Sequence, residues 1–180
     1  MTSKQAVVPT GRETSFSADE IIVSKTDPRG RITYANDVFC RVALYAEHEL
    51  IGQPHSIVRH PDMPRCVFKL LWDTIAQGQE VFALVKNLAK NGDHYWVLAH
   101  VTPSFDAKGQ LAGYHSNRRL PDRAEVVRIE PVYATLLAEE HKHADRRAGM
   151  EAGHALLREE LARRNLSYDR FLFALLDQAA

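Results

Sequence analysis

The sequence predicts an α+β fold: a five-stranded antiparallel sheet with short helices on one face, followed by a C-terminal helical extension. Three observations predict it. Runs of β-branched and aromatic residues alternate with Pro-, Gly- and Asn-containing turns over residues 20–119. A strongly helical stretch, residues 66–77, divides the first two of these runs from the last three. The residues after Pro121 have helical periodicity only.

The first two strands are predicted as a hairpin. Residues 20–36, EIIVSKTDPRGRITYAN, hold two β-type runs on either side of Asp27-Pro28-Arg29-Gly30. Proline sets the backbone angle of a turn and glycine tolerates a positive φ, so this tetrapeptide favours a tight reversal. Residues 37–53 have apolar side chains at helical spacing and reach Gly52, which indicates short helices lying over the hairpin.

The middle of the chain predicts one longer helix and then a meander. The helix predicted within the stretch CVFKLLWDTIAQGQ ends at Gly78. Its apolar stripe comprises Val67, Leu70, Leu71, Thr74 and Ile75. Residues 80–119 then give three β-type runs, separated by turn residues at 91–93 and 106–109. Helices collected on one face of such a sheet must cover either side chains or a ligand.

These patterns divide the chain into a mobile N-terminal tail (1–18), a sheet domain (19–121) and a helical extension (122–180). The extension has two amphipathic stripes, residues 126–137 and 150–161, with Gly149 and Gly153 expected to loosen the junction between them. A last short helix contains Phe171, Leu172, Leu175 and Leu176. So apolar a helix requires a partner, either the sheet domain or another subunit.

Composition excludes several classes of protein. The chain has 180 residues and no net charge, so no broad positive field attracts nucleic acid or an anionic membrane. The N-terminus lacks an apolar signal core and no segment approaches the roughly 20 apolar residues of a bilayer span, which predicts a cytoplasmic protein. The two cysteines are expected to be free thiols. No nucleotide, hydrolase or zinc-protease motif occurs, and the spacing of His141 and His143 disfavours a metal site, so an enzyme is not expected.

One polar stretch stands out, HSIVRHPDMPR at residues 55–65. Pro61 and Pro64 remove backbone donors and fix φ, so the segment is predicted to be a stiff turn rather than a helix. Arg59 has a planar charged fork suited to phosphate or carboxylate. His60 can donate, accept or stack, and Asp62 accepts hydrogen bonds.

Several motifs, in order and at matching spacing, carry a resemblance: ITYANDVF, ELIGQPHSIVRHPDMPR, VKNLAKNGDHYWV and GYHSNRR. Together they resemble a PAS domain, specifically the flavin-binding PAS sensor of bacterial aerotaxis receptors, over roughly residues 20–133. The resemblance implies a PAS fold and an FAD cofactor, retained by Arg59, His60 and Asp62.

The same resemblance points to Asn36, Asn87 and Tyr95 as further cofactor-binding residues. An Asn amide can satisfy both the donor and the acceptor of a flavin's polar edge, and an aromatic ring supplies a flat wall. Successive strand residues face opposite sides, so Tyr95 and Trp96 cannot both line a pocket, and Tyr95 is favoured.

The sequence also allows other roles for these residues and other contents of the pocket. Asn36 can equally cap the following helix, and Arg59, His60 and Asp62 can form a surface loop held by its own ion pairs. The pocket can be filled by side chains, which would make the protein a ligand-free interaction module. It can also hold haem or a small metabolite, with His55 or His60 as possible ligands. In light-sensing relatives a cysteine occupies the position of His55, so adduct photochemistry is not expected.

The favoured function is a cytoplasmic redox or oxygen sensor in an aerotaxis-like pathway, which signals by conformational change. Relative to the aerotaxis receptors, the chain is expected to lack the membrane and signalling regions. It is therefore expected to act on a separate signalling protein, or as a homodimer through its C-terminal helices.

Overall fold

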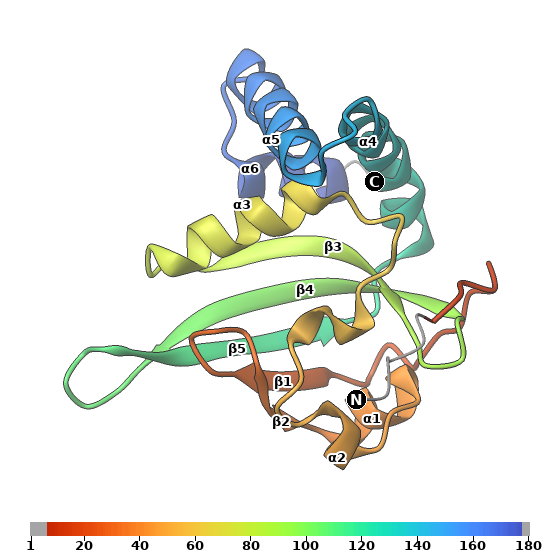
Figure 1. The fold of residues 1–180 in the computed structure, drawn as a ribbon, viewed down its shortest axis with the longest axis vertical. Helices are drawn as coiled ribbons and strands as arrows, with labels where there is room; N and C mark the ends of the chain where they lie inside the picture. Colours follow the sequence, from red (N-terminus) through yellow and green to blue (C-terminus); the bar gives the residue numbers. More distant parts are fainter. Residues whose placement is uncertain (1–6, 178–180) are drawn as a thin grey trace.

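The computed structural model describes residues 7–177 and has the α+β fold that the sequence predicts. Five antiparallel strands form one sheet in the order β2-β1-β5-β4-β3. The strands are β1 (Ile22–Thr26), β2 (Ile32–Ala35), β3 (Val81–Leu88), β4 (His94–Phe105) and β5 (Leu111–Arg119). The short helices between β2 and β3 are α1 (Asp37–Ala43), α2 (Glu47–Leu50), the 3₁₀ helix η1 (His55–Val58) and α3 (Arg65–Ala76). In Figure 1, α3 lies along β3 at one end of the sheet, and α1 and α2 lie beside β1 and β2 at the other end.

The β1–β2 turn is stabilised by one side chain. The carboxylate of Asp27 accepts hydrogen bonds at 2.9 Å from the backbone N–H groups of Arg29 and Arg31, and Gly30 has φ +75°. Gly30 is also required by packing, since a Cβ there would lie 2.7 Å from the ring of Trp72. The predicted hairpin therefore forms, and its turn reaches helix α3.

The N-terminal segment differs from the mobile tail expected for residues 1–18. Residues 1–6 lie outside the described residues, but residues 10–14 pair with the β3–β4 turn: Thr10 N–H donates to Gly92 O, and Thr14 N–H donates to His94 O, both at 2.8 Å. Phe16 is buried. The segment follows the turn because the backbone groups at 92–94 offer it unpaired partners.

Three helices follow the sheet: α4 (Arg123–His141), α5 (Arg146–Arg163) and α6 (Tyr168–Leu176). Helices α4 and α6 contact the outer edge strand β3, and α5 packs on α3 and α4 (Figure 1). The Tyr133 hydroxyl donates to Leu84 O at 2.6 Å, and the Asp169 carboxylate accepts from Phe82 N–H at 3.4 Å. These contacts satisfy backbone groups that an edge strand would otherwise expose. The apolar last helix therefore has its partner within the chain.

The two glycines of α5 do not loosen a junction, contrary to the expectation from sequence. The α4–α5 turn lies at residues 142–145, and Gly149 and Gly153 are buried inside the helix. A Cβ at Gly149 would lie 2.3 Å from Glu140 O, and one at Gly153 would lie 3.2 Å from the Cys66 sulfur. The glycines thus allow α5 to approach α4 and α3 closely. Within residues 7–177, no helix is both long and apolar enough to cross a bilayer.

Candidate functional site: a cavity between the sheet and helix α3

A cavity of about 320 Å³ lies between the inner face of the sheet and helix α3. This volume is at the lower end of the range for small-molecule sites, about 300–1,000 Å³. Helix α3 contributes Phe68, Leu71, Trp72 and Ile75, which lie at positions i, i+3, i+4 and i+7 and so share one face. The sheet contributes alternate residues of each strand, mostly small or apolar on β3 and β4. Its floor residues include Val85, Val97, Ala99 and Val101.

The most unusual group in the cavity wall is Arg118, near the end of β5. Its side chain is 2% exposed. One terminal nitrogen donates to the Ser24 hydroxyl, and the guanidinium lies over the Phe39 ring at 4.4 Å. The other two nitrogens, Nε and Nη1, are buried without a hydrogen-bond partner. Burial lowers the pKa of Arg118 to about 10, so the group remains charged at neutral pH. It is a buried cation that forms no ion pair with a carboxylate in residues 7–177.

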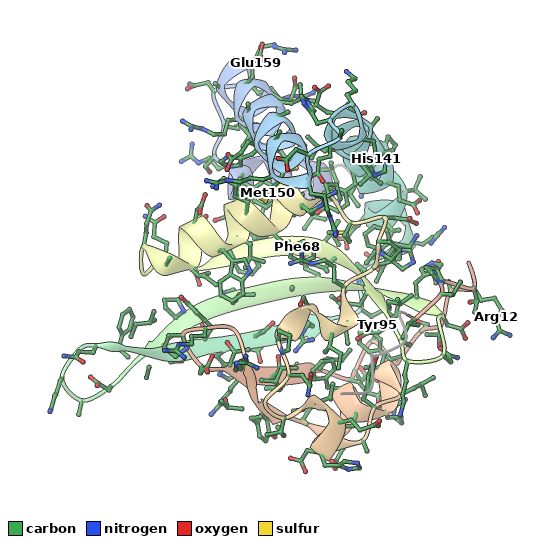
Figure 2. All side chains as sticks on the ribbon, in the orientation of Figure 1. Arg12, Phe68, Tyr95, His141, Met150 and Glu159 are labelled. Carbon is green, nitrogen blue, oxygen red and sulfur yellow. The ribbon has the colours of Figure 1, made fainter. Side chains whose placement is uncertain are left out.

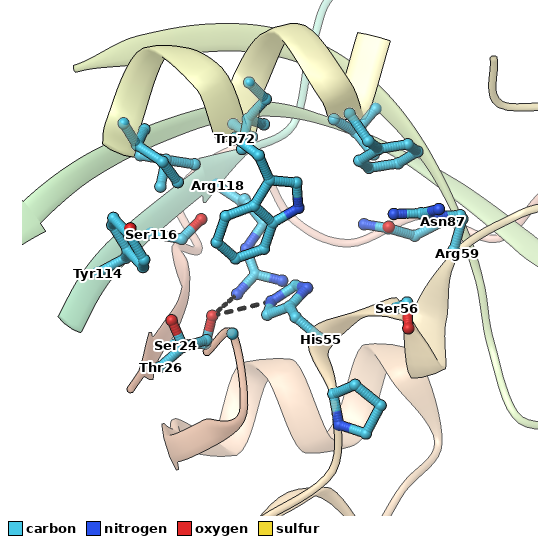
Figure 3. A pocket seen from close by; sticks show the side chains of 18 of the residues that line it. Ser24, Thr26, His55, Ser56, Arg59, Trp72, Asn87, Tyr114, Ser116 and Arg118 are labelled. Carbon is cyan, nitrogen blue, oxygen red and sulfur yellow. Dashed lines mark hydrogen bonds between the residues drawn. The ribbon is translucent and has the colours of Figure 1, made fainter. Parts of the chain in front are cut away.

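His55, the first residue of η1, shares the Ser24 hydroxyl with Arg118: its Nε2 lies 3.2 Å from that oxygen (Figure 3). Its ring also stacks on Phe39 at 5.9 Å. Burial, and then the neighbouring Arg118 charge, lower the pKa of His55 to about 3. His55 is therefore neutral at physiological pH and can present one N–H and one acceptor.

A second polar group lies at another part of the wall. Arg59 forms an antiparallel backbone bridge to Asn87 of β3, so the two side chains lie next to each other (Figure 3). The Arg59 guanidinium stacks on the Phe68 ring at 3.9 Å, and its Nε is buried without a partner. Burial and the nearby charges of Arg65 and Arg146 lower the pKa of Arg59. Two of the six predicted cofactor-binding residues, Arg59 and Asn87, therefore line the cavity.

His60 and Asp62 lie outside this cavity. The His60 ring is buried against His94, and its Nδ1 accepts from Asp62 N–H at 3.1 Å. Burial lowers the pKa of His60 to about 4. The Asp62 carboxylate is bound by Lys86 Nζ at 3.0 Å. Both residues stiffen the turn that presents Arg59, and they do so through contacts within the chain.

Asn36 caps helix α1. Its side-chain oxygen accepts from Phe39 N–H and from Val23 N–H, both at 3.0 Å, and its amide donates to Ile21 O at 2.8 Å. All of these partners are backbone groups, and Asn36 does not line the cavity. The geometry of Asn36 is therefore that of a helix cap, the alternative role that the sequence allowed.

Tyr95 shares the inner face of β4 with Val97 and Ala99, whereas Trp96 points outward and stacks on Tyr133 of α4. Tyr95 lies beyond the cavity, at the start of β4, where the N-terminal segment pairs with the neighbouring His94 (Figure 2). Its hydroxyl is buried without a hydrogen-bond partner. The choice of Tyr95 over Trp96 for the inner face thus agrees with the structure, although Tyr95 does not line the cavity itself.

Sequence reasoning missed Arg118, Ser24 and Trp72 as cavity residues. Arg118 lies in the motif GYHSNRR, two residues after Ser116 and four after Tyr114, which also line the cavity. The period-two alternation of a strand could have placed all three on one face. Trp72 shares a helical face with Phe68 and contacts the Tyr114 ring edge-on at 5.5 Å.

Comparison with known proteins now identifies the fold. A family model described as the PAS fold matches residues 18–115. The chain belongs to the PAS family. The chain is 43% identical over 129 residues to the aerotaxis receptor of Escherichia coli K12, a match of 72% of this chain and 25% of the receptor. It is 32% identical over 99 residues to the nitrogen fixation regulatory protein of Klebsiella pneumoniae, covering 55% of this chain and 20% of that protein.

The chain therefore spans a quarter or less of the length of these two relatives. Solved structures support the PAS fold as well. An RNA-binding light-oxygen-voltage receptor has a TM-score of 0.53 at 21% identity, covering 67% of this chain and 34% of that one. The light-oxygen-voltage domain of the photoreceptor Aureochrome1 has a TM-score of 0.51 at 22% identity, covering 71% and 94%. At these identities the likeness concerns the fold alone.

Proposed function

We propose that this PAS protein is a sensor that binds FAD in the cavity under α3 and signals the redox state of the flavin. The observation that supports this most is Arg118. A buried guanidinium with two unpartnered nitrogens destabilises a protein whose core contains no ligand. Its presence in a cavity wall therefore favours a ligand with oxygen or nitrogen acceptors. The similarity to an aerotaxis receptor supports a flavin as that ligand.

The other residues of the wall fit a flavin. A flat ring requires apolar faces, which Trp72, Leu71 and Val97 supply. It also requires donors at a polar edge, and the unpartnered polar atoms of the lining are Thr26 Oγ1, Arg59 Nε, and Nε and Nη1 of Arg118. The Asn87 amide adds both a donor and an acceptor. Among the described lining residues there is no cysteine, so adduct photochemistry is not part of the proposal.

When bound, a flavin supplies reversible electron transfer, with a change in charge and protonation of its ring. Arg118 favours added negative charge at its end of the cavity because it remains a cation at neutral pH. The Asn87 amide and neutral His55 can each exchange a donor for an acceptor by rotating. These residues would therefore hold oxidised and reduced ligand differently, which any redox-dependent shift requires.

The cavity wall is connected to the C-terminal helices. Asn87 lies on β3, and Tyr133 of α4 binds the β3 backbone at Leu84. Phe68 lies on α3, and Glu140 of α4 accepts a hydrogen bond from Cys66 at the start of α3. We propose that α4 transmits a change at the cavity to a separate signalling partner, with homodimerisation through the C-terminal helices and a cytoplasmic, aerotaxis-like role as parts of the same proposal. The role proposed is signalling rather than catalysis.

An absorbance spectrum of freshly purified protein tests the proposal. We expect a flavin spectrum that bleaches with dithionite, and release of FAD on denaturation. A colourless protein that takes up no added flavin would favour the ligand-free interaction module. A strong Soret band would instead favour haem.

A further inference from the structure

A second hollow, of about 890 Å³, lies on the outer side of the η1–α3 turn. It shares Pro54, Ser56 and Arg59 with the cavity described above, so Arg59 stands on the border between the two. We refer to it as the outer hollow. Its walls come from the turn at 53–65, from the end of α4 and from the start of α5.

The arginine and histidine side chains that line the outer hollow have no acidic side chain among them, and three of the five are arginines. They are Arg59, His60, Arg65, His141 and Arg146, and the lining includes no Asp or Glu. The charges of Arg65 and Arg146 are close enough to Arg59 to lower its pKa. Two carboxylates lie beside these lining residues: Glu140, which accepts from Cys66 N–H and lies 3.5 Å from Arg65, and Asp62, which lies 3.5 Å from His60 and is bound by Lys86. Of the three guanidinium groups, those of Arg59 and Arg146 make no ion pair with a carboxylate in residues 7–177, and Arg65 pairs with Glu140 alone.

Arg65 and Arg146 are held next to each other. Arg65 Nη1 donates to the backbone oxygen of Arg146 at 2.8 Å, which ties the first turn of α5 to the first turn of α3. The side chain of Arg146 is exposed, and in residues 7–177 it makes no ion pair with a carboxylate. A cluster of three guanidinium groups with one paired carboxylate is suited to phosphate oxygens, which accept several charge-assisted hydrogen bonds at once.

We propose that the outer hollow binds the diphosphate of FAD, with Arg59, Arg65 and Arg146 as its ligands, and that Arg146 makes the site selective for FAD over shorter flavins. This rests on the proposed function, because the isoalloxazine must occupy the inner cavity for the diphosphate to reach Arg59. It adds a role for α5: a residue outside the PAS-matched segment 18–115 takes part in binding the cofactor. Binding FAD would then fix the start of α5 against α3.

The test is a fluorescence titration of flavin-stripped protein with FAD and with riboflavin, which has no phosphate. We expect Arg146→Ala to weaken FAD binding about tenfold, the loss typical of one charge-assisted hydrogen bond, and to leave riboflavin binding unchanged. Arg147→Ala is the matched control, because Arg147 is the exposed neighbour, has the same charge and does not line the hollow. It should bind both flavins as the wild type does.

Two results would overturn the inference and leave the proposed function intact: wild-type FAD affinity in Arg146→Ala, or an equal loss of FAD and riboflavin binding in that variant. If the wild type bound neither flavin, the proposed function would fail, and this inference with it. Raised salt should weaken FAD binding more in the wild type than in Arg146→Ala, since phosphate contacts are screened.

Discussion

Two charged side chains are fully buried among residues 7–177, and they differ in how their polar atoms are satisfied. Glu140 lies between α3, α4 and α5: Oε1 accepts from Cys66 N–H at 2.8 Å, and Oε2 lies 3.5 Å from Arg65 Nε, an ion pair without a hydrogen bond. Arg118 faces a cavity and binds Ser24 alone, with two nitrogens unpartnered. A buried charge is tolerated when paired and costly when not. The comparison indicates a structural role for Glu140 and a ligand-binding role for Arg118.

The largest effect is expected at Glu140. Glu140→Ala should lower the free energy of unfolding by about 3 kcal/mol or more, because Cys66 N–H and Arg65 lose their buried partner. Urea denaturation measures this. The control Glu159→Ala removes an exposed carboxylate of α5, 3.8 Å from Arg163, and should change stability by less than about 0.5 kcal/mol. Equal stability of the two variants would remove the contrast between Glu140 and a surface charge.

The next effect concerns pH. The pKa of His55 is about 3 in the folded protein, against about 6.5 in an unfolded chain. Because the folded pKa is the lower one, the stability that depends on neutral His55 is complete above pH 6.5 and is lost as the pH falls towards 3. At pH 5 the loss amounts to about 2 kcal/mol.

His55→Gln should therefore lose about 2 kcal/mol less than the wild type between pH 7 and pH 5, as measured by urea denaturation. Comparing the variant with the wild type removes the contributions of His60, His94 and His154, whose pKa values burial also lowers. An identical pH dependence in both proteins would show that His55 is not held neutral beside Arg118.

The smallest effect compares two buried tyrosines. Tyr133→Phe removes the hydrogen bond to Leu84 O and should cost about 1 kcal/mol. Tyr95→Phe removes a buried hydroxyl that has no partner, and should leave the stability of flavin-free protein unchanged or raise it. Thermal or urea denaturation of both variants measures the difference. A greater loss for Tyr95→Phe would mean that its hydroxyl has a partner in solution.

Much of the fold could be predicted from local patterns. Turn residues such as Asp27 and Gly30 act through backbone preferences that operate over four residues, so the hairpin was predictable. The packing of α4 to α6 on β3 and α3 was not, because it depends on tertiary contacts such as those of Tyr133 and Glu140. Gly149 and Gly153 illustrate this, since the same residue type loosens one helix and allows close packing in another.

The site was predictable to a lesser degree. Arg59 and Asn87 could be selected from the PAS resemblance, and the β-bridge between them explains why both line the cavity. Asn36, His60 and Asp62 are also polar and were selected for the same reason, but their side chains bind other groups of the protein. Arg118 was missed because an arginine at a strand end is usually exposed, and only the three-dimensional structure shows that it is buried and unpaired.

The most direct test of the account is the stability of wild-type and Arg118→Met protein, each measured with and without FAD. If the unpartnered nitrogens of Arg118 bind a ligand, the flavin-free variant should be at least as stable as the wild type, because the substitution removes an uncompensated buried cation. FAD at about 100 times its dissociation constant should then stabilise the wild type by about 2.7 kcal/mol and the variant by much less. A variant as unstable as Glu140→Ala, with FAD stabilising both proteins equally, would show that Arg118 supports the fold rather than a flavin.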